Sequence, residues 1–166
     1  MAPELDVVRY DDPRVVVLTA EVQAEYGVRY GGDGDVSPMD ATEFAAPHGL
    51  FLLATSAGEP VAMGGWRHGG PLPGDAEVKR MYVRTAYRNG GWARRILAEL
   101  ERTAAAKGAR RMVLGTGNKQ PEAIALYRSC GYTDISGFGT YADAPDAVHL
   151  AKELRSSPSP AGVASR

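Results

Sequence analysis

Residues 77–93, EVKRMYVRTAYRNGGWA, constrain the fold more than any other stretch of this 166-residue chain. The alternating first half predicts a strand, and Arg88, Asn89, Gly90 and Gly91 predict a turn that runs directly into a helix. Glycines there let backbone N–H groups converge at the positive end of a helix dipole, a cradle for phosphate or pyrophosphate. The pattern is neither a P-loop nor a dinucleotide-binding loop. From the glycines alone, an ordinary strand–helix turn stays open as the alternative.

A second strand–loop–helix succession occupies residues 113–132, VLGTGNKQPEAIALYRSCGY. If its strand runs parallel beside the first one, both glycine loops lie at the same sheet edge, where open α/β sheets bind ligands. Tyr127, two turns into the helix, would then project near that edge. The alternatives are that Tyr127 only packs the helix and that Asn118 only shapes the turn.

The remaining sequence predicts one α/β (α+β) domain over residues 1–154, followed by a disordered tail over 155–166. A helix should begin at Pro13 after a capping aspartate and end near Gly27. Its expected buried side consists of Val16, Val17, Ala20, Val22 and Ala24. A short helix should follow Ser37. Strands are expected over 5–10, 50–55, 61–66, 77–83, 111–115, 132–136 and 148–154, and further helices over 92–107 and 121–130.

Composition narrows the function classes. The formal net charge is −1, which gives no basic field for nucleic acid, and the longest apolar runs are too short for a membrane span. Cys130 is the only cysteine, so neither a disulfide within the chain nor a cysteine-rich zinc site is expected. His48, His68 and His149 have no metal-ligand spacing and are interpreted as surface or loop residues, so no metal site is predicted. Without a secretory pattern at the N-terminus, the cytoplasm is the expected location.

Taken together, the two strand–loop–helix segments resemble the GNAT superfamily of acyl-CoA-dependent N-acyltransferases. The family signature Arg/Gln-x-x-Gly-x-Gly/Ala is matched by Arg88, Gly91 and Ala93. The downstream pattern is matched by Asn118, Ala125, Leu126, Tyr127, Gly131 and Tyr132. The resemblance implies a central mixed, mostly antiparallel sheet of six to seven strands flanked by about four helices.

The resemblance also assigns roles. Acetyl-CoA would be the cosubstrate, its pyrophosphate held beside Arg88 by the backbone N–H groups of Asn89, Gly90, Gly91, Trp92 and Ala93. The strand end at Met81, Tyr82 and Val83 would pair with the pantetheine arm and polarise the thioester carbonyl. Asn118 would contact the pantetheine. Tyr127 would protonate, or hydrogen-bond, the departing thiolate. Asn89 and Gly90 depart from the commoner glycine–basic pair and remove one side-chain contact with phosphate.

The expected reaction is direct attack of an amine on the thioester through a tetrahedral intermediate. Glu77 is the candidate base, with a solvated strand carboxylate as the alternative, and alternation places Lys79 and Met81 on its face of the strand. One candidate wall of the acceptor site consists of Tyr26, Tyr30 and the loop 31–35, and another consists of Trp66 and residues 138–141, which include Tyr141. Asp33 and Asp35 could attract a cationic amine, with a merely solvated loop as the alternative.

A small-molecule or amino-acid-like amine is the preferred acceptor, because the chain offers no basic groove for a macromolecule. A protein or peptide N-acetyltransferase and a catalytically silent acyl-CoA-binding module stay open as alternatives. A homodimer is possible by analogy with the family.

Overall fold

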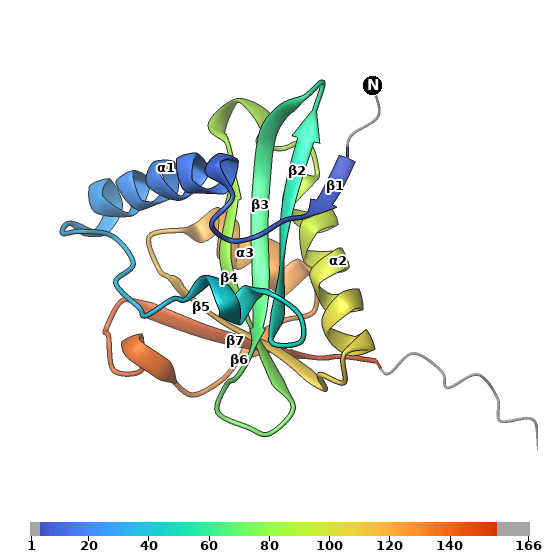
Figure 1. Cartoon of the computed structure of the whole chain (residues 1–166). Coiled ribbons are helices and arrows are strands. Elements are labelled where there is room, and N and C mark those ends of the chain that lie inside the picture. The colour runs from blue at the N-terminus through green and yellow to red at the C-terminus, as the bar shows by residue number, and fades with distance from the viewer. Residues whose placement is uncertain (1–3, 156–166) are drawn as a thin grey trace, which may run out of the picture.

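A single seven-stranded sheet organises the computed structural model, which describes residues 4–155 (Figure 1). The strands lie in the order β1-β2-β3-β4-β5-β7-β6. Only β4 and β5 pair in parallel, and every other neighbouring pair is antiparallel, which confirms the mixed, mostly antiparallel sheet. The bounds are β1 Glu4–Val7, β2 Gly49–Ser56, β3 Glu59–His68, β4 Asp75–Val83, β5 Arg111–Gly117, β6 Thr133–Asp134 and β7 Ala147–Glu153.

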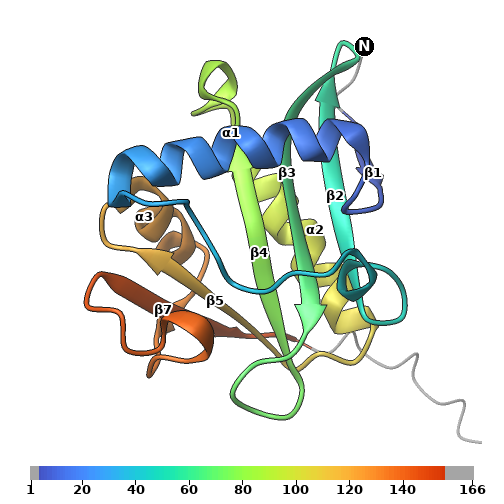
Figure 2. The same cartoon turned by 60° about the vertical axis from the view of Figure 1, so that its left-hand side comes forward.

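Helices cover both faces of the sheet (Figures 1 and 2). Helix α1, Pro13–Tyr30, lies on one face, and α2, Trp92–Ala106, and α3, Pro121–Ser129, pack on the other. The described residues thus hold three α-helices rather than about four. The short helix expected after Ser37 is a single 3-10 turn, Ala41–Phe44, which Asp40 caps through its side chain.

Helix α1 differs from expectation in its end and in its buried side. Asp12 caps its start by accepting a hydrogen bond from the Arg14 N–H at 2.9 Å, and the helix continues past Gly27 to Gly31. Its fully buried residues are Val15, Leu18 and Val22. The expected burial of Val16 and Val17 is wrong, since they are 55% and 52% exposed, and Ala20 and Ala24 are exposed as well.

Strand β4 contains an irregularity that positions the site. Its register against β3 shifts between Met63 and Gly65, and Arg80 there adopts a φ of 59°. Such a bulge inserts one extra residue and reverses the alternation beyond it. Lys79 therefore faces the α1 side with Glu77, whereas Met81 packs against the core under α2. The expectation that Met81 shares the Glu77 face is wrong for this reason.

The sheet opens immediately beyond that point. Strands β4 and β5 pair only through Asp75–Arg111, Ala76–Met112 and Glu77–Val113. After Glu77 the two strands diverge, as Figure 2 shows, so one edge of β4 has no strand beside it.

The C-terminal tail and the length of the helices bear on two further expectations from the sequence. Apart from Arg155, the tail predicted over residues 155–166 lies outside the described residues. Within residues 4–155, no helix has the length and apolar character that crossing a membrane would require.

Candidate active site

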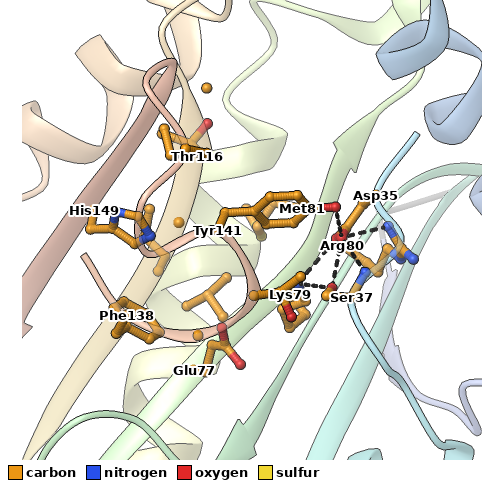
Figure 3. Close-up of a pocket in the computed structure, with 18 of the residues that line it drawn as sticks. Asp35, Ser37, Glu77, Lys79, Arg80, Met81, Thr116, Phe138, Tyr141 and His149 are labelled. Atoms are coloured by element: carbon orange, nitrogen blue, oxygen red, sulfur yellow. Dashed lines mark hydrogen bonds and ion pairs between the residues drawn. The ribbon is translucent and has the colours of Figure 1, made fainter. Parts of the chain in front are cut away.

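A cavity of about 620 Å³ lies where β4 and β5 separate (Figure 3). Its walls come from the middle of β4, the end of β5, the C-terminal half of α1, residues 34–37, and residues 138–149. Segments far apart in the sequence therefore meet at one point. The sequence-predicted residues Tyr26, Tyr30, Glu77, Met81, Tyr127 and Tyr141 all line this cavity.

Asp35 is the most heavily bonded side chain of the cavity wall. Its carboxylate accepts hydrogen bonds from Lys79 Nζ at 3.1 Å, Arg80 Nη1 at 3.3 Å, Ser37 Oγ at 2.6 Å and the Tyr141 hydroxyl at 3.1 Å. Burial by itself would raise the pKa of Asp35, but the Lys79 ammonium and the bonds from Ser37 outweigh burial and lower it to about 2. The alternative that Asp35 is merely a solvated loop residue is therefore wrong, because its carboxylate joins the loop to β4 and to Tyr141.

Glu77 points to the cavity but is not paired with Lys79. Its Oε1 accepts two hydrogen bonds from Arg67, from Nε at 3.1 Å and Nη2 at 3.0 Å. Arg67 also donates to Glu43 Oε2 at 3.1 Å. Within the described residues, no donor contacts Glu77 Oε2, so this oxygen is free to meet a ligand.

Tyr127 reaches the cavity from α3. Its side chain is only 7% exposed and its ring packs edge-on against Tyr132, with 5.7 Å between the ring centroids. Burial raises the pKa of Tyr127 well above the ordinary phenol value. The hydroxyl therefore stays protonated at neutral pH and can donate a hydrogen bond.

The start of α2 presents backbone N–H groups to solvent. Asn89 and Gly91 have positive φ values of 65° and 81°, and no side chain caps the helix. The first turn therefore has N–H groups without side-chain partners. Arg88 does not extend freely over this turn, because it pairs with Glu25 at 2.7 Å and donates to the Val83 carbonyl at 3.0 Å.

The free edge of β4 also offers N–H groups. The Arg84 N–H donates to the Val61 carbonyl on β3 at 2.9 Å. Because successive N–H groups of an extended strand point to opposite sides, those of Val83 and Met81 point away from β3 and into the gap. Tyr82 lies between them, and its hydroxyl donates to Glu21 at 3.2 Å on the α1 face.

Trp66 and Asn118 lie outside the cavity wall, as do Tyr82, Val83 and residues 88–93 of the expected acetyl-CoA site. Trp66 is 1% exposed and packs in the core under α2, where its indole N–H donates to Thr103 at 3.0 Å. It therefore does not form the acceptor wall expected of it. Asn118 is exposed in the loop between β5 and α3, and its backbone N–H donates to the Asp146 carbonyl at 2.8 Å.

Several residues of the cavity, Arg67 and His149 among them, were not predicted from the sequence. His149, expected to be a surface or loop residue, is 7% exposed in β7 and faces the cavity beside Phe138, with 5.1 Å between the two rings. The available signal was the strand pattern itself, since His149 alternates with Val148 and Leu150, which pack on the opposite face.

Comparison with known proteins decides the family. The profile described as Acetyltransferase (GNAT) family matches residues 19–132. The IAA acetyltransferase of Azospirillum brasilense is 34% identical over 140 residues, which cover 84% of this chain and 90% of that protein. The chain belongs to the GNAT acetyltransferase family. It is therefore an acyltransferase, as the two motifs predicted.

Solved structures agree on the GNAT fold. A Klebsiella pneumoniae protein assigned as an acyl-CoA N-acyltransferase superposes with a TM-score of 0.76 at 24% identity, over 92% of this chain and 98% of that one. The PaiA N-acetyltransferase of Thermoplasma acidophilum, solved in complex with coenzyme A, gives a TM-score of 0.68 at 16% identity, over 92% and 99% of the two chains.

The family uses acetyl-CoA, and this GNAT chain has groups that fit it. The uncapped, glycine-lined start of α2 suits a pyrophosphate, and the unpaired edge of β4 suits an extended chain that carries amide groups.

Proposed function

We propose that this GNAT enzyme transfers the acetyl group of acetyl-CoA to the primary amine of a small molecule or amino-acid-like acceptor in the cytoplasm. The observation that carries the proposal is the cavity of about 620 Å³ at the separation of β4 and β5. Its size falls within the range of roughly 300–1,000 Å³ that is typical of small-molecule sites.

Binding is assigned to the backbone. N–H groups of Asn89, Gly90, Gly91, Trp92 and Ala93 would hold the pyrophosphate, and Arg88 keeps this loop attached to β4 and α1. The N–H groups of Met81 and Val83 would receive the pantetheine arm and polarise the thioester carbonyl. In this scheme the β4 bulge sets the position at which they meet the reacting centre.

The chemistry is assigned to cavity side chains. Acetyl-CoA supplies an activated thioester when bound. Glu77 presents Oε2 toward the acceptor while Arg67 fixes Oε1, so it can orient an ammonium or receive its proton. The Tyr127 hydroxyl would donate a hydrogen bond to the departing thiolate, or pass a proton to it while taking up one from the attacking nitrogen. Tyr26, Tyr30 and Tyr141 would bound the acceptor.

The first test is thermal unfolding with and without acetyl-CoA, followed by a screen of free amines and peptides for release of CoA. Acetyl-CoA at about 100 times its Kd should stabilise the protein by about 2.7 kcal/mol. Free amines should turn over faster than peptides. Acetylation of peptides alone would instead identify a protein N-acetyltransferase.

Tyr127→Phe provides the matched variant, since it removes only the hydroxyl. Turnover should fall tenfold or more while the acetyl-CoA shift in melting temperature persists. If acetyl-CoA binds but no amine or peptide is acetylated by the wild type, the chain is a silent acyl-CoA-binding module and the proposal fails.

A further inference from the structure

We propose that His149 is the group that takes the proton from the acceptor amine, an inference that rests on the proposed function. His149 is buried in β7, yet it lines the same cavity as Glu77 and Tyr127. Figure 3 shows its ring directed into the cavity across from Glu77 and Lys79.

The neighbouring strand gives the imidazole its place. His149 pairs with Gly115 of β5, two residues beyond Val113, at which the pairing of β5 with β4 ends. A Cβ built on Gly115 would lie 3.4 Å from the imidazole, so the ring lies over this glycine. Phe138 packs at 60° to the ring from another side. The imidazole is thereby held at the point where the sheet opens.

The imidazole is also unengaged. Among the hydrogen bonds of residues 4–155, none uses a ring nitrogen of His149, whereas Glu77 accepts two bonds from Arg67 and Asp35 accepts bonds from four side chains. Among residues 4–155, the Thr19 hydroxyl is the only fully buried side-chain polar atom without a hydrogen-bond partner. The ring nitrogens of His149 also have no partner among these residues, so they cannot be fully buried. The ring nitrogens of His149 therefore touch the cavity and are available to a ligand.

The charged groups around the cavity leave this role open to His149. Lys79 is occupied by Asp35, and the Asp134 carboxylate on β6 pairs with exposed Arg128. The cavity wall also holds many other titratable groups: Glu77, Lys79 and Arg80 of β4, Arg67 and His68 of β3, Tyr26 and Tyr30 of α1, Tyr127 of α3, and Asp35, Glu43, Tyr141 and Asp146 outside the main helices and strands. Glu77 stands two strands away and is in register with Ala151, two residues along β7 from His149, which leaves space for an amine between the two side chains.

The proton balance is complete with these residues. An alkyl ammonium with a pKa of about 10 must lose a proton before attack, and a ring nitrogen of a neutral imidazole can accept it. The freed lone pair of nitrogen forms the C–N bond, and the thiolate leaves with the electron pair of the C–S bond and takes the Tyr127 proton. The second nitrogen proton restores Tyr127, and the imidazolium returns its proton to water.

The test compares His149→Gln and His149→Ala with wild type, using an amine acetylated in the screen, and follows kcat/KM between pH 5.5 and 9.5. Wild-type kcat/KM should rise with pH through an ionisation that is absent from both variants. Both variants should lose about 100-fold at pH 7.5 and recover as the pH approaches the pKa of the amine itself. Hydroxylamine, already unprotonated at neutral pH, should react with variants and wild type at similar rates.

His48→Gln is the control, because His48 is exposed and lies outside the cavity. An unchanged pH profile in both His149 variants overturns the inference, and so does an equal loss with hydroxylamine, which would indicate a packing role. The acetyl-CoA shift in melting temperature should persist in at least one variant; its loss in both would also assign His149 to structure. If the wild type itself acetylates no amine, the proposed function has failed, and this inference fails with it.

Discussion

At the scale of single residues, Asp35 shapes the acceptor side of the cavity. Its partners Lys79 and Arg80 have side chains only 12% and 5% exposed. Asp35→Asn would leave both cations without a counter-charge in a poorly solvated place, and we expect a loss of about 3 kcal/mol in the free energy of unfolding at pH 7. Urea unfolding measures this, with Asp33→Asn in the same exposed loop as the control that should change stability by less than about 0.5 kcal/mol.

The Asp35 carboxylate also makes the free energy of unfolding depend on pH in the acid range. Its pKa in the folded protein, about 2, is lower than the ordinary value of 3.8, so its contribution is fully present above pH 4 and disappears as the pH falls toward 2. The difference in stability between wild type and Asp35→Asn should therefore shrink between pH 4 and pH 2. A difference that stays constant over this range would show that the ion pairs are not its source.

Residue-level prediction from sequence succeeded where spacing carries the information. Gly91 and Tyr127 belong to local motifs, and both lie where those motifs imply. The places of Asp35 and His149 in the cavity wall were not predicted, because they depend on neighbours that the fold brings together. Asp35 meets Lys79 across 44 positions of sequence, and no local pattern distinguishes it from exposed Asp33.

At the scale of elements, the sequence largely predicted which segments form strands and helices. It did not predict which residues of α1 and β4 face which side of the sheet. Residues 15–18 are all apolar, so the sequence there does not determine which side of α1 is buried. Packing against the sheet buries Val15 and Leu18 and leaves Val16 and Val17 exposed. In β4 the bulge at Arg80 turns Met81 to the other face. A one-residue insertion into a ladder depends on the partner strand and leaves no signature in the sequence of β4.

The turn before α2 supports a prediction that separates strain from binding. Gly91 has a φ of 81°, and a Cβ there would meet nothing within 4 Å. Gly91→Ala should therefore cost about 1 kcal/mol through backbone strain alone, and by shifting the N–H groups of the turn it should weaken acetyl-CoA binding about tenfold in calorimetric titration.

Gly32→Ala is the matched control, since Gly32 has a φ of 72° and equally open surroundings. It should lose similar stability and bind acetyl-CoA as the wild type does. Equal binding by both variants would move the pyrophosphate site away from the start of α2.

At the scale of the whole molecule, the sheet consists of two parts held by a short seam. Three residue pairs join β4 to β5, whereas β5 and β7 pair over seven positions. The order of the elements could be predicted from the sequence, whereas the parallel pairing of β4 with β5 could only be stated as a condition for the two loops to share one edge. The divergence could not, because it depends on the twist of the sheet and the bulge together. It is this divergence that opens the cavity and leaves the N–H groups of Met81 and Val83 without a strand partner.

Hydrogen exchange of individual amides tests whether this gap is the acetyl-CoA site. Without ligand, the amides of Met81 and Val83 should exchange faster than that of Tyr82, which faces β3. Saturating acetyl-CoA should slow the Met81 and Val83 amides and those of residues 91–93 at least tenfold, because new hydrogen bonds then cover them. The central amides of β2, remote from the gap, should not change. If acetyl-CoA raises the melting temperature while Met81 and Val83 keep their exchange rates, the ligand binds elsewhere and the role assigned to the β4 edge is wrong.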